Sequence, residues 1–119
     1  MSRHTQAIGI DVGTTGVKGV LIDADGHLLA DHTIPHDLSS PHPGWAEEDP
    51  ADWERGALGV LTVLAQHPAC KPGQIAAIGV SGMVPALVML DEAGQPLRPS
   101  IQQNDARAAA EVAELAARI

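Results

Sequence analysis

The beginning of the chain contains three short apolar segments separated by two glycine-containing turns. Residues 7–11 and 17–23 flank a Gly-Thr-Thr-Gly turn at 13–16, and residues 28–34 follow the pair Asp25-Gly26. An Asp-Gly pair between apolar segments is a strong hairpin signal, because glycine adopts the positive φ that such turns need. The pattern predicts three consecutive strands that pair antiparallel.

The rest of the chain alternates between helical and strand patterns. A proline-rich loop spans residues 35–50, and residues 51–66 then place apolar side chains at helical spacing. Residues 75–80 are apolar throughout, which is typical of a strand buried on both faces, and residues 86–90 predict a further strand.

A last helix is predicted to begin at Asn104 or Asp105, because either residue is a good N-cap. The resulting order is β-β-β-α-β-β-α, a mixed sheet with flanking helices in the α/β class. It differs from a dinucleotide-binding unit, in which the first strand leads directly into a helix. We expect a single domain over residues 1–119.

Composition and charge exclude several kinds of partner. The chain has 119 residues, a formal net charge of −8 and 2% aromatic residues, so the core must be aliphatic. It has no basic footprint for nucleic acid or for an anionic membrane surface. No apolar run reaches the roughly 20 residues of a membrane span, and no signal-peptide pattern is present. The single Cys70 cannot form an internal disulfide, and we interpret it as a thiol without a role. We expect a cytoplasmic protein.

The turn between the first two strands carries the residues best suited to chemistry. Asp11 ends the first strand, Gly13, Thr14 and Thr15 form the turn, and Lys18 lies on the outgoing strand. Small residues let backbone N–H groups approach an anion, while the hydroxyls and the lysine add donors and charge. A carboxylate beside phosphates is tolerated when a divalent cation lies between them, which predicts Mg²⁺ held by Asp11 through water. From the residues alone, an ordinary hairpin turn with an exposed lysine is the alternative.

Four segments in the same order resemble the FGGY family of carbohydrate kinases, in particular its xylulokinase-like members. The first resembles Ile-Gly-Ile-Asp-x-Gly-Thr-Thr-x-x-Lys, the phosphate motif of the actin/Hsp70/sugar-kinase superfamily. The second resembles Pro-x-Trp-x-Glu-x-Asp-Pro-x-x-Trp, the third a core strand followed by Leu-Leu-Asp-x-x-Gly-x-Pro-Leu, and the fourth Pro-(Ala/Ser)-Ile-x-x-Asn-Asp-x-Arg. These segments are residues 8–18, 43–53, 75–97 and 99–107.

The resemblance implies a ribonuclease H-like (actin-like ATPase) fold and transfer of the ATP γ-phosphate to a hydroxyl of a ketose or polyol. It implies ATP and Mg²⁺ as cofactors, Asp11 near the metal, and Gly13, Thr14, Thr15 and Lys18 at the ATP phosphates. It also implies that the general base lies downstream, in a C-terminal domain absent from this chain. We therefore expect the 119-residue chain alone to be inactive.

The resemblance places the substrate near Met83, Val84 and Pro85, and near Asn104 and Asp105. Xylulokinases typically have Gly-Gln-Met-His where this chain has Gly82-Met83-Val84-Pro85, so Val84 and Pro85 stand in place of the Met-His pair that touches the sugar. Neither the valine nor the proline side chain donates a hydrogen bond, so another pentulose, a hexulose, an acid sugar or a polyol stays open as substrate. Helix capping is the alternative role for the asparagine and the aspartate.

Other interpretations also stay open. A non-catalytic truncated product, and a non-sugar ATPase domain of the actin/Hsp70 superfamily, are alternatives to the kinase fragment. Trp45 could cover a sugar face or anchor its loop, whereas Trp53 is expected in the core. His32, His36 and His42 lack metal-ligand spacing and are expected to be solvated. A homodimer through exposed apolar surface is possible.

Overall fold

The computed structural model describes residues 5–119, which form two compact units. One, here called the sheet unit, comprises residues 5–37 and Ala51–Met83; the other, the loop unit, comprises Leu38–Pro50 and Val84–Ile119. The elements are β1 (Gln6–Val12), β2 (Gly16–Asp23), β3 (Leu28–Pro35), β4 (Glu47–Glu48), α1 (Pro50–Gln66), a 3₁₀ helix η1 (Pro72–Gln74), β5 (Ile75–Gly82), β6 (Ser100–Ile101) and α2 (Ala109–Ala116).

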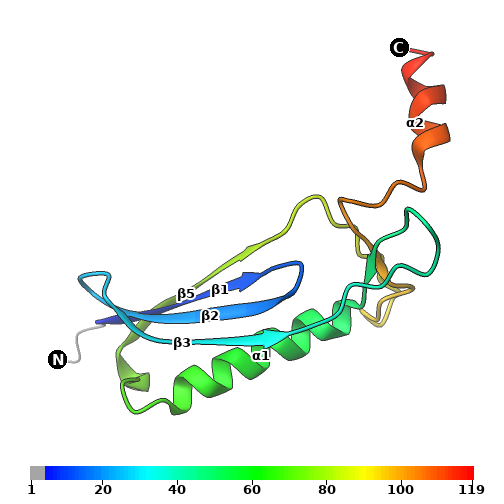
Figure 1. Ribbon diagram of the computed structural model, residues 1–119. Coiled ribbons are helices and arrows are strands. Elements are labelled where there is room, and N and C mark those ends of the chain that lie inside the picture. The colour runs from blue at the N-terminus through cyan, green and yellow to red at the C-terminus, as the bar shows by residue number, and fades with distance from the viewer. Residues whose placement is uncertain (1–4) are drawn as a thin grey trace. The chain divides into compact units, whose positions relative to one another are not determined.

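The sheet unit is built on a four-stranded mixed sheet of order β3-β2-β1-β5 (Figure 1). β1 pairs antiparallel with β2, and β2 pairs antiparallel with β3. The predicted meander is therefore confirmed. Gly26 lies at φ +84° in the turn between β2 and β3, as its Asp-Gly signal predicts. β5 joins the other side of β1 in parallel.

Helix α1 runs along one face of this sheet (Figure 1), and the core lies between them. The core is aliphatic, as the composition requires. Its buried members are Ile8, Ile10, Val17, Leu21, Val60 and Leu64. Two glycines allow the close approach of helix and sheet: an ideal Cβ on Gly19 would overlap the Val60 side chain, and one on Gly56 would lie 2.7 Å from Val17 Cγ2. Trp53 is half-buried and lies outside this cluster.

The predicted burial of β5 on both faces is wrong. The strand forms where expected, but Ile78 is 52% and Val80 is 70% exposed. The physical reason is position: β5 is an edge strand of the described sheet, and the core cluster draws its buried sheet residues from β1 and β2.

The predicted strand at residues 86–90 is also wrong. Only isolated bridges form there, from Leu87 to Ile101 and from Leu90 to Pro96. The prolines at 85 and 96 lack the N–H that a continuous ladder would need. Two short strands that were not predicted form instead: β6, and β4 within the segment predicted to be a loop. They pair antiparallel in the loop unit.

Helix α2 begins later than predicted. Its N-cap is Ala108, with no side-chain capping bond, so neither Asn104 nor Asp105 caps it. Asp105 lies four residues before the start of the helix, and its carboxylate instead accepts hydrogen bonds from Ala46 N and Arg107 Nη2. Among residues 5–119, no helix is long and apolar enough to cross a membrane.

Candidate functional site

The turn between β1 and β2 is tight and leaves backbone donors unused. Gly13 donates its N–H to Gly16 O at 3.0 Å, which closes the turn. No acceptor within residues 5–119 takes the N–H groups of Thr14 and Thr15, the two residues at its tip. Neighbouring unpaired N–H groups in a turn form an anion-binding concavity. The tip of the turn thus offers two neighbouring N–H donors that the described part of the chain leaves unused.

Strand register places the two predicted charged residues beside this turn. Asp11 on β1 is the cross-strand partner of Lys18 on β2, so both side chains project from the same row of the sheet. The Lys18 Nζ lies 4.0 Å from Asp31 Oδ2, and both side chains are more than half exposed. Such exposed pairs contribute little stability, so Lys18 remains available to an anion.

A third polar residue joins this row from β5. Ser81 is the parallel register partner of Asp11, and its Oγ donates to Asp11 Oδ1 at 2.8 Å. Ser81 is not among the site residues predicted from the sequence. The signal was present, because the serine occupies the carboxyl end of the strand that lies parallel to β1, and ligand sites gather at the carboxyl ends of parallel strands.

An open cavity of about 440 Å³ lies along this row on the sheet unit. The cavity exists because Gly9 and Gly79, which are register partners on β1 and β5, have no side chains to fill the space above the backbone. The cavity lining comprises Gly9, Ile10, Asp11, Lys18, Val20, Gly79, Val80 and Ser81. The charged groups stand at one end of an otherwise apolar depression.

The residues present fit a hydrated divalent cation. Asp11 is exposed, and no residue among 5–119 donates a hydrogen bond to its Oδ2. Mg²⁺ is usually held by one or two carboxylates and keeps several waters. One carboxylate whose second oxygen accepts no hydrogen bond within residues 5–119 meets that description.

The predicted substrate residues at 83–85 fall into the two units. Met83 belongs to the sheet unit, where its N–H donates to Val12 O at 3.2 Å and its Sδ lies 3.9 Å from Thr14 Oγ1. The methionine is therefore held against the β1–β2 turn. Val84 and Pro85 belong to the loop unit, and Val84 is 78% exposed.

In the loop unit, the Asp105 carboxylate is occupied by protein donors. Its side chain is 2% exposed, and it accepts from Ala46 N at 2.7 Å and from Arg107 N, Nε and Nη2 at 2.7–2.9 Å. The Arg107 hydrogen bond is the main cause that holds the pKa of Asp105 far below its usual range. The same side-chain hydrogen bonds, which Arg107 donates to Asp105, raise the pKa of Arg107. Asn104, by contrast, is exposed.

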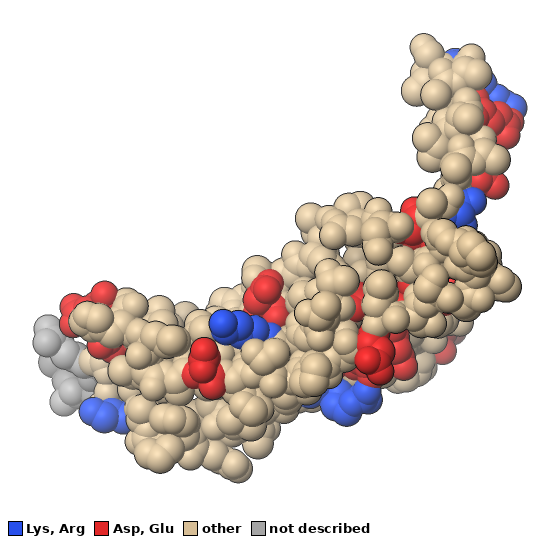
Figure 2. Space-filling view, in the orientation of Figure 1, with Lys and Arg blue, Asp and Glu red and all other residues tan. Residues whose placement is uncertain are grey.

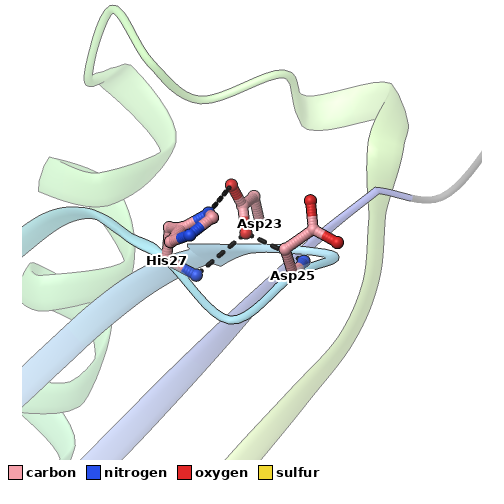
Figure 3. A group of neighbouring side chains, drawn as sticks. All are labelled: Asp23, Asp25 and His27. Atoms are coloured by element: carbon pink, nitrogen blue, oxygen red, sulfur yellow. Dashed lines mark hydrogen bonds and ion pairs between the residues drawn. The ribbon is translucent and has the colours of Figure 1, made fainter.

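A second polar group, at the β2–β3 hairpin, is explained by turn geometry (Figure 3). Asp23 Oδ1 accepts from the backbone N–H groups of Asp25 and His27, both at 2.9 Å, and Oδ2 lies 3.0 Å from His27 Nδ1. The His27 backbone bond is the main cause that lowers the pKa of Asp23. These bonds stabilise the hairpin and require no ion.

The visible face of the chain carries charged side chains of both signs. Figure 2 shows acidic side chains as well as Lys and Arg side chains on this face.

The comparisons with known proteins identify the family. Residues 6–119 match the N-terminal domain of the FGGY family of carbohydrate kinases. The chain belongs to this family. It is 38% identical to the xylulose kinase of Klebsiella pneumoniae over 104 residues, which cover 87% of this chain and 21% of that relative. It is 32% identical to the glycerol kinase of Synechocystis over 118 residues, covering 98% and 24%.

Solved structures agree on the fold. The xylulose kinase of Rhodospirillum rubrum superposes with a TM-score of 0.89 at 48% identity, covering 96% of this chain and 23% of that one. The gluconate kinase of Lactobacillus acidophilus superposes with a TM-score of 0.87 at 34% identity, covering 95% and 22%. The mixed sheet is thus that of the actin-like ATPase fold, as predicted. This FGGY-family chain spans about a fifth to a quarter of the length of these relatives.

Proposed function

We propose that this chain is the N-terminal part of the first domain of an ATP-dependent sugar kinase. The observation that supports this most directly is the β1–β2 turn. Its Thr14 and Thr15 N–H groups have no acceptor within residues 5–119, and the turn is flanked by the exposed Asp11 carboxylate and the exposed Lys18 ammonium group. This arrangement suits a phosphate chain that carries a divalent cation.

The roles follow from charge. The turn N–H groups and Lys18 would bind phosphate oxygens, and Asp11 would hold Mg²⁺ through water. Bound Mg²⁺ would neutralise charge on the transferring phosphoryl group. Because phosphoryl transfer depends mainly on positioning and charge stabilisation, these few residues are a substantial part of the machinery. The base that activates the sugar hydroxyl would come from the remainder of the longer chain.

The acceptor class is a ketose, sugar acid or polyol. The names of the relatives above give xylulose, gluconate and glycerol as the acceptors of those proteins. A further relative, at 34% identity, is an L-xylulose/3-keto-L-gulonate kinase. Met83, Val84, Pro85 and Asn104 are the residues we assign to acceptor recognition. The side chains of Val84 and Pro85 add only apolar contact, so hydroxyl recognition would depend on Asn104 and on residues outside this chain.

A coupled ATP assay on the longest natural product of the gene that encodes this sequence tests the proposal. Xylulose, L-xylulose, gluconate and glycerol are the acceptors to compare. Sugar-dependent ADP release is expected, with Asp11→Asn lowering kcat by roughly 100-fold. Hydrolysis of ATP that no acceptor stimulates would support the non-sugar ATPase instead. The 119-residue chain alone is expected to show no turnover.

A further inference from the structure

Ser81 and Asp11 meet at the carboxyl ends of two parallel strands that lie far apart in the sequence. The β1–β5 register pairs them, and the Ser81 hydroxyl donates to Asp11 Oδ1 at 2.8 Å. Both side chains are exposed, so burial alone does not restrain either of them. The hydrogen bond is therefore the interaction that selects the orientation of the Asp11 carboxylate.

The orientation it selects directs the second carboxylate oxygen toward the β1–β2 turn. Asp11 Oδ1 is bound on the β5 side, whereas Oδ2 lies 3.8 Å from the position that a Cβ on Gly13 would occupy, at the start of the turn. No donor within residues 5–119 bonds to Oδ2. An aspartate side chain with one oxygen held this way has fewer rotamers open to it before any ligand arrives.

The surroundings of the pair leave it without a competing partner. The three polar residues in the cavity lining are Asp11, Lys18 and Ser81, and the floor behind them is formed by Gly9 and Gly79. The lysine does not form an ion pair with the aspartate, because its Nζ lies toward Asp31 on β3. The serine is thus the one described side chain that orients this carboxylate.

We propose that Ser81 is a positioning residue that aims the Asp11 carboxylate at the divalent cation of the phosphate site. The proposal rests on the proposed function, since it assumes that Asp11 faces a metal ion. Ser81 acts through Asp11 and does not itself touch the cation or the nucleotide. Residues that orient a metal-facing carboxylate by hydrogen bonds typically change metal affinity 10- to 100-fold when they are removed.

Manganese broadening of amide NMR signals tests this on the 119-residue chain without any turnover. Mn²⁺ alone, titrated into the ¹⁵N-labelled chain, is expected to broaden the signals of residues 11–15 first. Ser81→Ala should require about 10-fold more Mn²⁺ for the same broadening. Ser81→Thr keeps the hydroxyl on a strand position that suits a β-branched residue, and it should restore the wild-type response.

Two controls separate positioning from general damage. Thr62→Ala removes a hydroxyl that bonds only Leu58 O within α1, and it should leave the Mn²⁺ response unchanged. Thermal unfolding should show Ser81→Ala to be as stable as the wild type. Equal weakening in Ser81→Ala and Ser81→Thr would overturn the proposal, because the hydroxyl would not be the cause.

The Mn²⁺ titration distinguishes a failure of the Ser81 proposal from a failure of the proposed metal site at Asp11. A Mn²⁺ response that disappears in Asp11→Asn but is unchanged in Ser81→Ala would overturn the role of Ser81 and leave the metal site standing. A response that is identical in wild type and Asp11→Asn would overturn both, since no cation would then be held by that carboxylate.

Discussion

The Arg107 guanidinium lies 3.8 Å from the centroid of the Trp45 ring. His42 meets the same ring edge-on, at a centroid separation of 4.4 Å. Arg107 Nη2 also forms an ion pair with Glu47 Oε1 at 2.8 Å, and Glu47 accepts a hydrogen bond from Arg98. One face of the indole is therefore occupied by protein, and this favours the loop-anchoring interpretation of Trp45 over a sugar-covering one.

Removal of the Arg107 side chain charge should loosen Trp45. In a Trp53→Phe background, Trp45 is the only tryptophan and reports on this loop alone. Arg107→Met is expected to raise quenching of its fluorescence by acrylamide, because the cation–π contact and the bonds to Asp105 and Glu47 are lost together. Stern–Volmer titration measures the effect.

Arg118→Met is the matched control for this substitution. Arg118 pairs with Glu114 on the exposed surface of α2, away from any tryptophan contact that the structure records. Its quenching curve should superimpose on that of the parent. Equal quenching in Arg107→Met and the parent would show that the guanidinium does not cover the ring in solution.

Acid should loosen the loop that carries Trp45. The Asp105 pKa is lowered in the folded chain, chiefly by the Arg107 hydrogen bond, whereas in the unfolded chain it returns to about 3.9. The stabilisation is therefore fully present above about pH 4 and is lost as pH falls toward the folded-state value. The background for this test is Trp53→Phe with His42→Gln, because the His42 ring contacts the indole and would add a response of its own. Trp45 fluorescence should then be flat from neutral pH to about 4 and change below it.

Asp105→Asn tests the assignment of that transition. The amide can still accept from Ala46 N but carries no charge for Arg107, so its fluorescence at neutral pH should resemble that of the acidified parent. A transition that persists unchanged in Asp105→Asn would have to come from another carboxylate.

The N-terminal sheet was predictable because its signals are local. Alternating apolar residues and the Asp25-Gly26 turn determine the meander without reference to the rest of the chain, and α1 follows from apolar spacing after Asp49-Pro50. The exposure of β5 was not predictable in this way. A strand buried on both faces and an exposed strand can have the same apolar sequence. Ile78 and Val80 therefore do not indicate which of these two environments β5 has.

The candidate site was predictable where one segment contains it. Asp11, the turn and Lys18 lie within eight residues, and strand pairing brings them together as expected. Ser81 was missed because its relation to Asp11 exists only through the parallel pairing of β1 and β5. The occupation of Asp105 was missed for the same reason, since its partner at Ala46 lies 59 residues away in the sequence.

Gln6 should be a measurable source of stability for the sheet unit. It is 7% exposed, its Nε2 donates to Ala69 O at 2.9 Å, and its Oε1 accepts from Lys71 N at 2.8 Å. Gln6→Leu leaves two backbone groups without these partners and is expected to lower the free energy of unfolding by about 1–3 kcal/mol. Urea titration measures the loss, and Gln66→Leu at the exposed end of α1 should change it little.

The closest packing in the sheet unit gives the sharpest prediction for stability. An ideal Cβ on Gly19 would overlap the Val60 side chain and lie 2.9 Å from Leu64 Cδ1, and both residues are fully buried. Gly19→Ala should therefore push α1 away from β2 and cost about 1–3 kcal/mol of unfolding free energy in urea titrations.

Two further variants decide whether the helix contact is the cause. Gly73→Ala adds the same methyl group where no atom lies within 4 Å, so it should leave the urea midpoint near that of the wild type. Val60→Ala removes the overlapping methyls, so combining it with Gly19→Ala should cost less than the sum of the two single substitutions. Strictly additive losses would mean that the added methyl is accommodated without contact with Val60, and that α1 does not pack against Gly19 as the structure shows.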